Sequence, residues 1–186
     1  MTDFFSRRST MAGMGACLLT AACGNGVGNR GGAEIDARVN ATLAHMYDHY
    51  PGTNDLNAKA SGVLVMPLIT EAGFGIGGSY GRGALQINNV TVDYYSAASA
   101  SFGFQIGAQQ FAHVLFFMTE NALSDFRHGS GWAAGGDIEY AVSDRGGNLS
   151  VDTTNALSPV IAVIFGQAGL HLGATLEGTK YTRIIP

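Results

Sequence analysis

Apolar side chains recur at helical spacing in residues 33–50. They fall three or four positions apart, which gathers side chains on one face of an α-helix. Pro51 and Gly52 follow, and both residue types end helices. The pattern predicts an amphipathic helix over 33–50, and residues 54–61 predict a short second helix. The residues that form the apolar face are Ile35, Val39, Leu43, Met46, Tyr47 and Tyr50.

From residue 73 the pattern changes to alternation. The segment 73–83 reads GFGIGGSYGRG, in which Phe74 and Ile76 alternate with glycine. Alternation predicts an extended strand, here with one nearly bare face. Such a strand bends readily and lets another backbone or an aromatic ring approach closely. The same pattern returns in 101–107 and 164–173, which indicates repeated strands of one strongly curved sheet.

The first six residues of this segment also match G-x-G-x-x-G, the spacing of a dinucleotide-binding loop. Such a loop needs a helix directly after the glycines, because the helix N-terminus binds the pyrophosphate. Here residues 81–87 read GRGALQI and lead to Asn88 and Asn89, a turn signal. The sequence therefore favours a bending strand over a nucleotide site, and it predicts no cofactor.

The rest of the chain alternates short apolar strands with turn signals. Thr119 precedes a helical pattern as an N-cap and Gly129 follows it as a stop, so a further helix is expected near 119–128. Residues 144–148 (DRGGN) predict a hairpin turn. Helices outside a run of hairpins indicate an α+β fold: a strongly curved, mainly antiparallel, glycine-rich sheet, open and barrel-like, with an N-terminal helix. Besides the glycine-rich segments, the predicted strands cover residues 62–66, 90–95, 112–118, 132–142, 149–153, 159–165 and 170–185.

The composition supports one globular domain and disfavours a nucleic-acid partner. Of the 186 residues, 46% are hydrophobic and 13% are charged, which is enough apolar material for a sizeable core. The 10 Lys and Arg residues against 14 Asp and Glu residues give a net charge of −4. No block of like charge is present to steer a nucleic acid to the protein.

The first 22 residues have the order of an export signal. Arg7 and Arg8 precede a weakly apolar run over 11–22, which is too short to span a bilayer as a helix. The paired arginines resemble a twin-arginine signal, although Ser9 and Thr10 differ from the usual apolar continuation. We expect export, by the twin-arginine or the general route.

Residues 19–23 (LTAAC) resemble a bacterial lipobox, in which the cysteine thiol carries diacylglycerol. The alternative is an ordinary cleaved signal that contains a cysteine. Cleavage before Cys23 removes Cys17, so one thiol remains and no intrachain disulfide can form. An unpaired exposed thiol is a liability in an oxidising compartment unless it is capped. We therefore expect a lipidated Cys23 and a flexible, glycine-rich tether over 23–32, followed by a domain over 33–186.

An anchor and a tether would hold the domain at the periplasmic side of the cell envelope. Gly24 follows Cys23 in place of the aspartate that typically retains bacterial lipoproteins at the inner membrane, so the outer membrane is preferred. Loss of the signal removes two arginines and one aspartate, which leaves a mildly acidic protein with a net charge of about −5.

The sequence gives little support for catalytic or metal-binding residues. Ser130 lacks the strand-to-helix context of a nucleophile elbow. His45 and His49 stand four apart on the first helix, a spacing that can chelate a metal, but the glutamate of H-E-x-x-H is missing and solvated histidines are favoured. Asp137 and Glu139 share one face of a strand, as paired acids require, yet a solvated sheet face explains them better.

Two further histidines lie in apolar strands. His113 is expected to be a core or boundary histidine with its hydrogen bonds satisfied, and His171 is expected on the outer side of a strand. We therefore predict no catalytic residues, no metal site and no enzyme activity. A hydrolase that uses Asp137, Glu139 or His113 is the weakest alternative.

Several segments together resemble the SYLF domain family in its bacterial lipoprotein form. The likeness runs from about residue 33 to the end of the chain, in order and with the same gaps. The segments are GVLVMPLITEAGFGIGGSYGRGAL (62–85), YYSAASASFGFQIGAQ (94–109), FMTENALSDFRHGSGW (117–132), SVDTT (150–154), PVIAVIFGQAGL (159–170) and LEGTKYTRI (176–184).

The resemblance implies a lipid-binding module without catalytic residues. SYLF domains of eukaryotes are described as binding phosphoinositide membranes and, in fungi, actin, which an exported bacterial domain would not meet. Leu68 and Glu71 stand where family members often place lysines. Each lysine near an anionic surface contributes roughly 1 kcal/mol, so binding here should depend more on apolar contact.

The expected partner is a phospholipid membrane. The alternative is a structural or interaction lipoprotein of the envelope, in which Cys23 supplies all membrane contact and the domain binds another protein. The residues expected to contact lipid are Lys59, Phe74, Ile76, Arg82 and Arg127.

Overall fold

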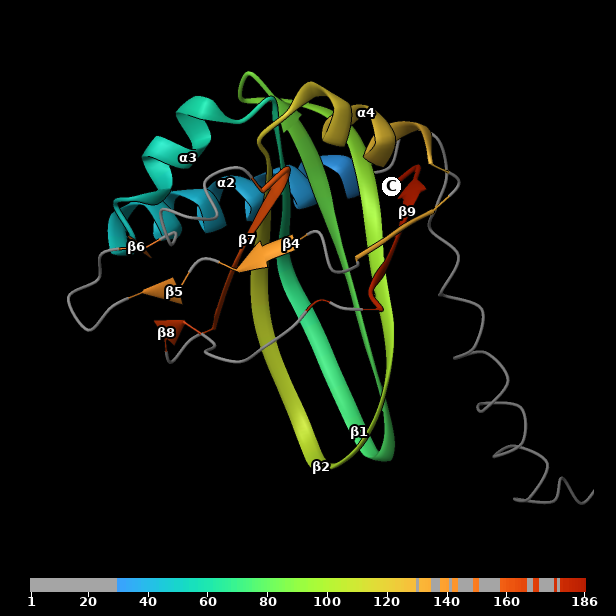
Figure 1. Cartoon of the computed structure of the whole chain (residues 1–186). Coiled ribbons are helices and arrows are strands. Elements are labelled where there is room, and N and C mark those ends of the chain that lie inside the picture. The colour runs from blue at the N-terminus through green and yellow to red at the C-terminus, as the bar shows by residue number, and fades with distance from the viewer. Residues whose placement is uncertain are drawn as a thin grey trace, which may run out of the picture.

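A strongly curved sheet with helices on its two faces forms the described part of the chain (Figure 1). The predicted α+β class is confirmed, and among the described residues the strand pairs are antiparallel except for one parallel pair. The computed structural model describes residues 30–129, 131–134, 138–140, 142–143, 149–150, 158–166, 169–170, 176 and 178–186.

The predicted amphipathic helix is α2 (Gly31–His49), which begins two residues earlier than expected. Its apolar face is buried through Ile35, Val39, Leu43 and Met46. The short helix α3 (Thr53–Lys59) follows after Pro51 and Gly52.

Helix α4 (Glu120–His128) has the ends that the sequence predicts. The Thr119 hydroxyl oxygen accepts a hydrogen bond from the Ala122 amide at 3.2 Å, so Thr119 is the N-cap. Gly129 is the C-cap, in an extended conformation.

A single long hairpin dominates the sheet. Strand β1 (Gly62–Ile87) has 26 residues and β2 (Val90–Phe117) has 28. They pair antiparallel along their whole length and are joined by Asn88 and Asn89, whose φ angles of 51° and 62° suit a tight two-residue turn. The sequence predicts five separate extended segments here, at 62–66, 73–83, 90–95, 101–107 and 112–118, and the structure joins them into two continuous strands.

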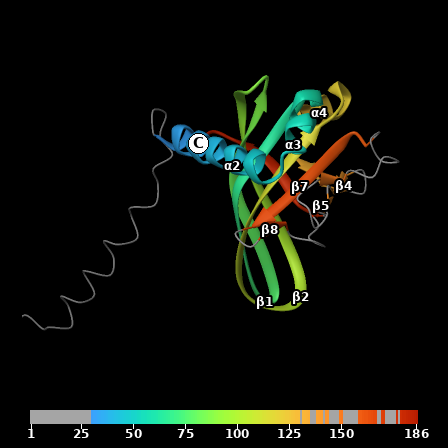
Figure 2. The same cartoon turned by 90° about the vertical axis from the view of Figure 1, so that its left-hand side faces the viewer.

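The hairpin folds back on itself at its glycine-rich middle, so each strand has two arms (Figures 1 and 2). At this bend the partner of β1 shifts from Ile106, opposite Phe74, to Gly103, opposite Gly75, which is a β-bulge. No helix follows the glycines, because β1 continues to Ile87. The preference for a bending strand over a dinucleotide loop is therefore confirmed.

Glycine also lets the two arms of β1 touch. A Cβ atom at Gly83 would overlap the carbonyl oxygen of Val65, and one at Gly81 would overlap that of Leu68. The close approach of another backbone, predicted from the bare strand face, is confirmed at these two positions.

Strand β2 is the centre of the sheet. One edge pairs with β1, while the other pairs with β9 at residues 94–98 and with β7 at residues 111–117. The outer strands complete the sheet, and β5 pairs separately with β6 around the predicted 144–148 turn, which lies outside the described residues. The remaining strands are β3 (Trp132–Ala133), β4 (Ile138–Tyr140), β5 (Val142–Ser143), β6 (Leu149–Ser150), β7 (Val160–Gly166), β8 (Gly169–Leu170) and β9 (Lys180–Ile184).

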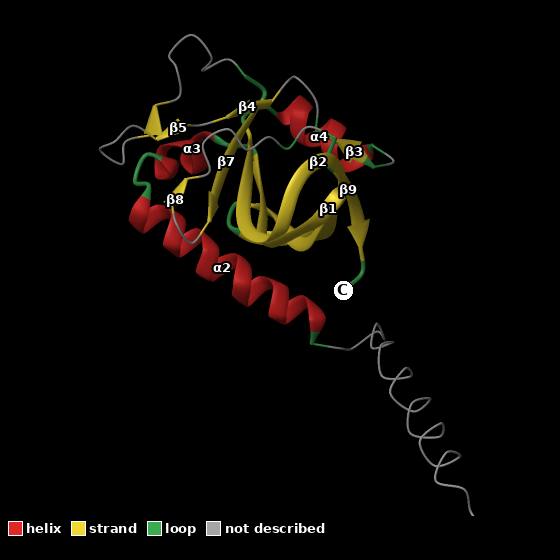
Figure 3. Ribbon diagram, turned by 90° about the horizontal axis from the view of Figure 1, so that it is seen from below, coloured by secondary structure: helices red, strands yellow, loops and turns green. Residues whose placement is uncertain are grey.

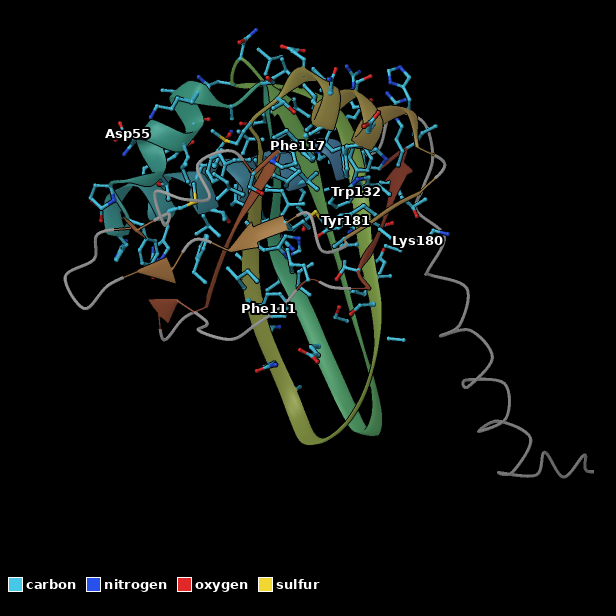
Figure 4. All side chains as sticks on the ribbon, viewed as in Figure 1. Asp55, Phe111, Phe117, Trp132, Lys180 and Tyr181 are labelled. Carbon is cyan, nitrogen blue, oxygen red and sulfur yellow. The ribbon has the colours of Figure 1, made fainter. Side chains whose placement is uncertain are left out.

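Each face of the sheet buries its own apolar cluster. We call the face covered by α2 and α3 the α2 face, and the other face, which α4 covers, the α4 face (Figure 3). On the α4 face Trp132 packs against Phe117 and Tyr181, with ring centroids 6.3 and 5.6 Å away (Figure 4). Strand β7 is buried on both faces, as its continuous apolar run indicates.

Candidate functional site

The bend of the hairpin gathers large apolar residues at the end of the molecule opposite α3 and α4 (Figures 1 and 2). Phe74 pairs with Ile106 and Ile76 pairs with Phe102 across the two strands. No Asp, Glu, Lys or Arg occurs over 72–81 or 94–117. The bend is therefore an uncharged, apolar end of the described part of the chain, and the described helices lie away from it.

The structure does not bring the five predicted lipid-binding residues together. The backbone of Phe74 and Ile76 lies in the bend, and their side chains are outside the described part. Lys59 ends α3, Arg82 lies on the α2 face of β1, and Arg127 lies in α4. The cations are thus distributed over both faces of the sheet. Cys23 lies outside the described residues.

Arg127 is held in an ion pair. The carboxylate of Asp93, whose side chain is only 5% exposed, accepts hydrogen bonds from Arg127 of α4 and Arg183 of β9. The Nη2 atom of Arg127 lies 3.2 Å from the carboxylate. This arrangement links a helix and a strand to β2, so Arg127 has a structural partner that sequence reasoning missed.

A groove follows α2 on the sheet surface. It consists of two hollows, of about 180 and about 450 Å³, that share Pro67 and Leu68. We call it the α2 groove. Its helix side includes Glu34, Arg38, Ala41, Thr42 and His45. Its sheet side includes Pro67, Leu68, Tyr80, Arg82 and Phe165.

A β-bulge creates the middle of this groove. Met66 pairs with His113 and Ile69 pairs with Phe111, so Pro67 and Leu68 together oppose one residue of β2. The bulge leaves the Leu68 side chain 37% exposed on the α2 face. Proline in a strand is confined to edges and bulges, so Pro67 was a signal that the sequence prediction did not use.

His113 is a core histidine, as predicted, but only half of its hydrogen bonds are made. Its Nε2 atom lies 2.8 Å from the Tyr181 hydroxyl oxygen, whereas Nδ1 has no partner among the described residues. Burial lowers the pKa of His113 to about 3, so the ring is neutral at physiological pH.

The other candidate residues form no described constellation. His45 and His49 are both exposed on α2, and their rings lie 4.0 Å apart between centroids and are tilted by 32°. The described residues include no group of three His, Cys, Asp or Glu side chains able to hold a metal ion. Ser130, Asp137, His171 and the side chain of Glu139 lie outside the described part.

No described helix combines the length and the apolar character needed to cross a bilayer.

Comparison with known families identifies the domain. Residues 98–183 match the family model Ysc84, described as a Las17-binding protein actin regulator. Residues 98–183 therefore belong to the SYLF domain family. The match extends from β2 through β9, and it confirms the family that the sequence segments resemble. The SYLF family is associated with the binding of lipids and of actin regulators. A search of curated proteins found no match to the chain.

Proposed function

We propose that this SYLF domain binds phospholipid membranes through the bend of its hairpin and acts without catalysis. The observation that carries the proposal is the pairing of Phe74 with Ile106 and of Ile76 with Phe102 at an uncharged end of the molecule. Transfer of apolar side chains from water into a lipid surface is favourable, and aromatic rings suit the membrane interface.

The magnitude of this contact is sufficient for reversible binding. Full burial of one Phe or Ile side chain contributes about 1.5–3 kcal/mol. Partial insertion of a few such residues therefore contributes several kcal/mol, which is comparable to one acyl chain. The bend carries no cation, so we expect weak dependence on anionic lipid and on salt.

The proposal includes an anchored, exported chain. Residues 1–22 would direct export, and Cys23 would carry diacylglycerol at the periplasmic side of the envelope, with the outer membrane preferred. The support is the LTAAC segment and the Gly24 that follows it. The tether would let the bend reach the same bilayer that holds the anchor.

Vesicle co-sedimentation tests the bend. The Cys23→Ser protein, which has no lipid anchor, should sediment with vesicles of phosphatidylcholine alone and with vesicles that also contain phosphatidylglycerol. Replacement of both Phe74 and Ile76 by serine should lower binding at least about tenfold, since two apolar side chains are lost. A matched control replaces Val90 and Val92, which are 62% and 40% exposed at the opposite end of the hairpin, by serine. Equal binding by the two double variants would contradict the proposal.

A second candidate function follows from the family description, which names a protein that binds another protein. In this case the domain would bind an envelope protein, and Cys23 would supply all membrane contact. A Cys23→Ser protein that is fully soluble in cells and does not sediment with either kind of vesicle would favour this function. Retention of that variant on membranes would favour the first.

A further inference from the structure

We propose that the α2 groove binds one long-chain fatty acid, an unbranched alkyl chain that ends in a single carboxylate. This site is separate from the bend, and the inference does not depend on membrane binding.

The middle of the groove presents apolar surface to solvent. Leu68 is held outward by the bulge and is 37% exposed, and Tyr80 beside it is 56% exposed. Exposed apolar side chains that line a common hollow mark a binding surface more strongly than isolated ones. Beyond Leu68 the groove continues to Phe165 and Ala41, so an alkyl chain can lie along it.

The other end of the groove carries an unbalanced positive charge. Arg38 forms an ion pair with Glu34 at 2.7 Å, whereas Arg82 forms no ion pair with any described residue. The charged side chains that line this end are two arginines and one glutamate. One net positive charge next to an apolar channel complements a ligand with one negative charge, and a guanidinium binds a carboxylate through two parallel hydrogen bonds.

The dimensions suit a single chain. The groove follows α2 from Glu34 to His45, a length of about 16 Å at 1.5 Å per residue. Its volumes of about 180 and about 450 Å³ together lie in the range of small-molecule sites. Such sites combine apolar walls with few polar groups that fix the orientation of the ligand.

Displacement of a fluorescent fatty acid by palmitate tests this assignment. The Cys23→Ser protein should bind one palmitate per chain, and affinity should rise by up to about fourfold per added methylene until the chain fills the groove. Hexadecanol, which has the same chain without the charge, should bind at least about fivefold more weakly. Arg82→Gln should weaken palmitate by a similar factor and leave hexadecanol unchanged, and Leu68→Asp should weaken both.

Matched controls make each result decisive. Lys180→Gln removes an exposed cation outside the groove, and Val90→Ser removes an exposed apolar side chain at the hairpin turn, so both should bind palmitate normally. Circular dichroism should show that Arg82→Gln and Leu68→Asp are folded, as expected for exposed positions. The assignment is overturned if palmitate does not bind, if Arg82→Gln and Lys180→Gln behave alike, or if diacyl phospholipid vesicles compete as well as palmitate.

Substitutions at the bend and in the α2 groove should have independent effects. In the Cys23→Ser background, the Phe74→Ser, Ile76→Ser protein should bind vesicles more weakly and keep its palmitate binding. Arg82→Gln in the same background should bind palmitate more weakly and keep its vesicle binding. Loss of both activities in both variants would contradict the separation of the sites.

Discussion

Gly83 illustrates how one missing side chain determines the path of a strand. The two arms of β1 touch where the backbone at Val65 faces Gly83, and the sulfur of Met66 lies 2.6 Å from the place of a Cβ atom there. A backbone carbonyl cannot move away without breaking its strand, so this contact leaves no alternative to glycine.

Gly83→Ala should destabilise the fold severely. The added methyl group would overlap a fixed carbonyl, and overpacking of this kind costs about 1–3 kcal/mol or more. Gly78→Ala is the matched control, because its Cβ atom would meet only the Ser99 carbonyl oxygen, at 3.2 Å. Urea unfolding measures both. A Gly83→Ala protein as stable as Gly78→Ala would show that the arms are not in contact.

His113 couples stability to pH. The folded protein keeps this ring neutral down to a pKa of about 3, whereas an unfolded chain protonates it near 6.5. Between these values the unfolded state binds more protons, so the free energy of unfolding falls as the pH falls. Above pH 6.5 both states are neutral, and this residue causes no pH dependence.

We therefore expect His113→Gln to flatten the acid side of the stability profile. In the wild type this residue alone should lower the free energy of unfolding by up to about 1.4 kcal/mol per pH unit below pH 6.5. Urea unfolding between pH 7 and pH 4 compares the two slopes, and carboxylates contribute equally to both proteins. Parallel profiles would mean that His113 titrates normally in the folded state.

At the scale of elements, Asp93 joins three segments that are distant in sequence. Its buried carboxylate on β2 binds Arg127 of α4 and Arg183 of β9. Both arginines are partly exposed, so either cation can return to water at little cost. The carboxylate cannot, because it is buried.

This asymmetry predicts non-additive substitutions. Arg127→Gln and Arg183→Gln should each cost less than about 1 kcal/mol, since the other arginine still pairs with Asp93. The double variant should cost roughly 3 kcal/mol, because it leaves a buried carboxylate without a cation. A double-mutant cycle by urea unfolding measures the coupling, with Arg82→Gln as a control outside the pair. Strict additivity would contradict the shared role of Asp93.

The elements also show what the sequence could predict. Periodicity located α2 and α4, and the strand character of the glycine-rich segment 73–83 was correct. The continuity of β1 and β2 was missed, because it depends on pairing between positions as distant as Gly62 and Phe117. For the same reason the ion pair at Asp93 and the convergence of Arg82 with α2 are visible only in the folded chain.

At the scale of the whole molecule, the proposed contacts with lipid are spatially separate. The bend lies at one end of the hairpin, the α2 groove lies along one face of the sheet, and Cys23 precedes both in the chain. The bend and the anchor at Cys23 would contact the same bilayer, and two linked contacts with one bilayer bind far more tightly than either contact alone.

Fractionation of cells should therefore reveal redundancy. The Phe74→Ser, Ile76→Ser protein should remain on membranes through its anchor. The Cys23→Ser protein should be released only in part, because the bend alone still binds the membrane. The combination of all three substitutions should be fully soluble. Release by the bend substitutions alone would show that Cys23 carries no lipid.

The two-residue turn at Asn88 and Asn89 has a consequence for the order of folding. The contacts next to the turn, such as Ile87 with Val90, are local in sequence. Pairing can proceed from them, residue by residue, toward Gly62 and Phe117. Strand β9 must instead find β2 across the whole later part of the chain, since Tyr94 pairs with Ile184. During synthesis the hairpin can therefore form early. The edge of β2 that pairs with β9 then has no partner strand until the last residues of the chain are made.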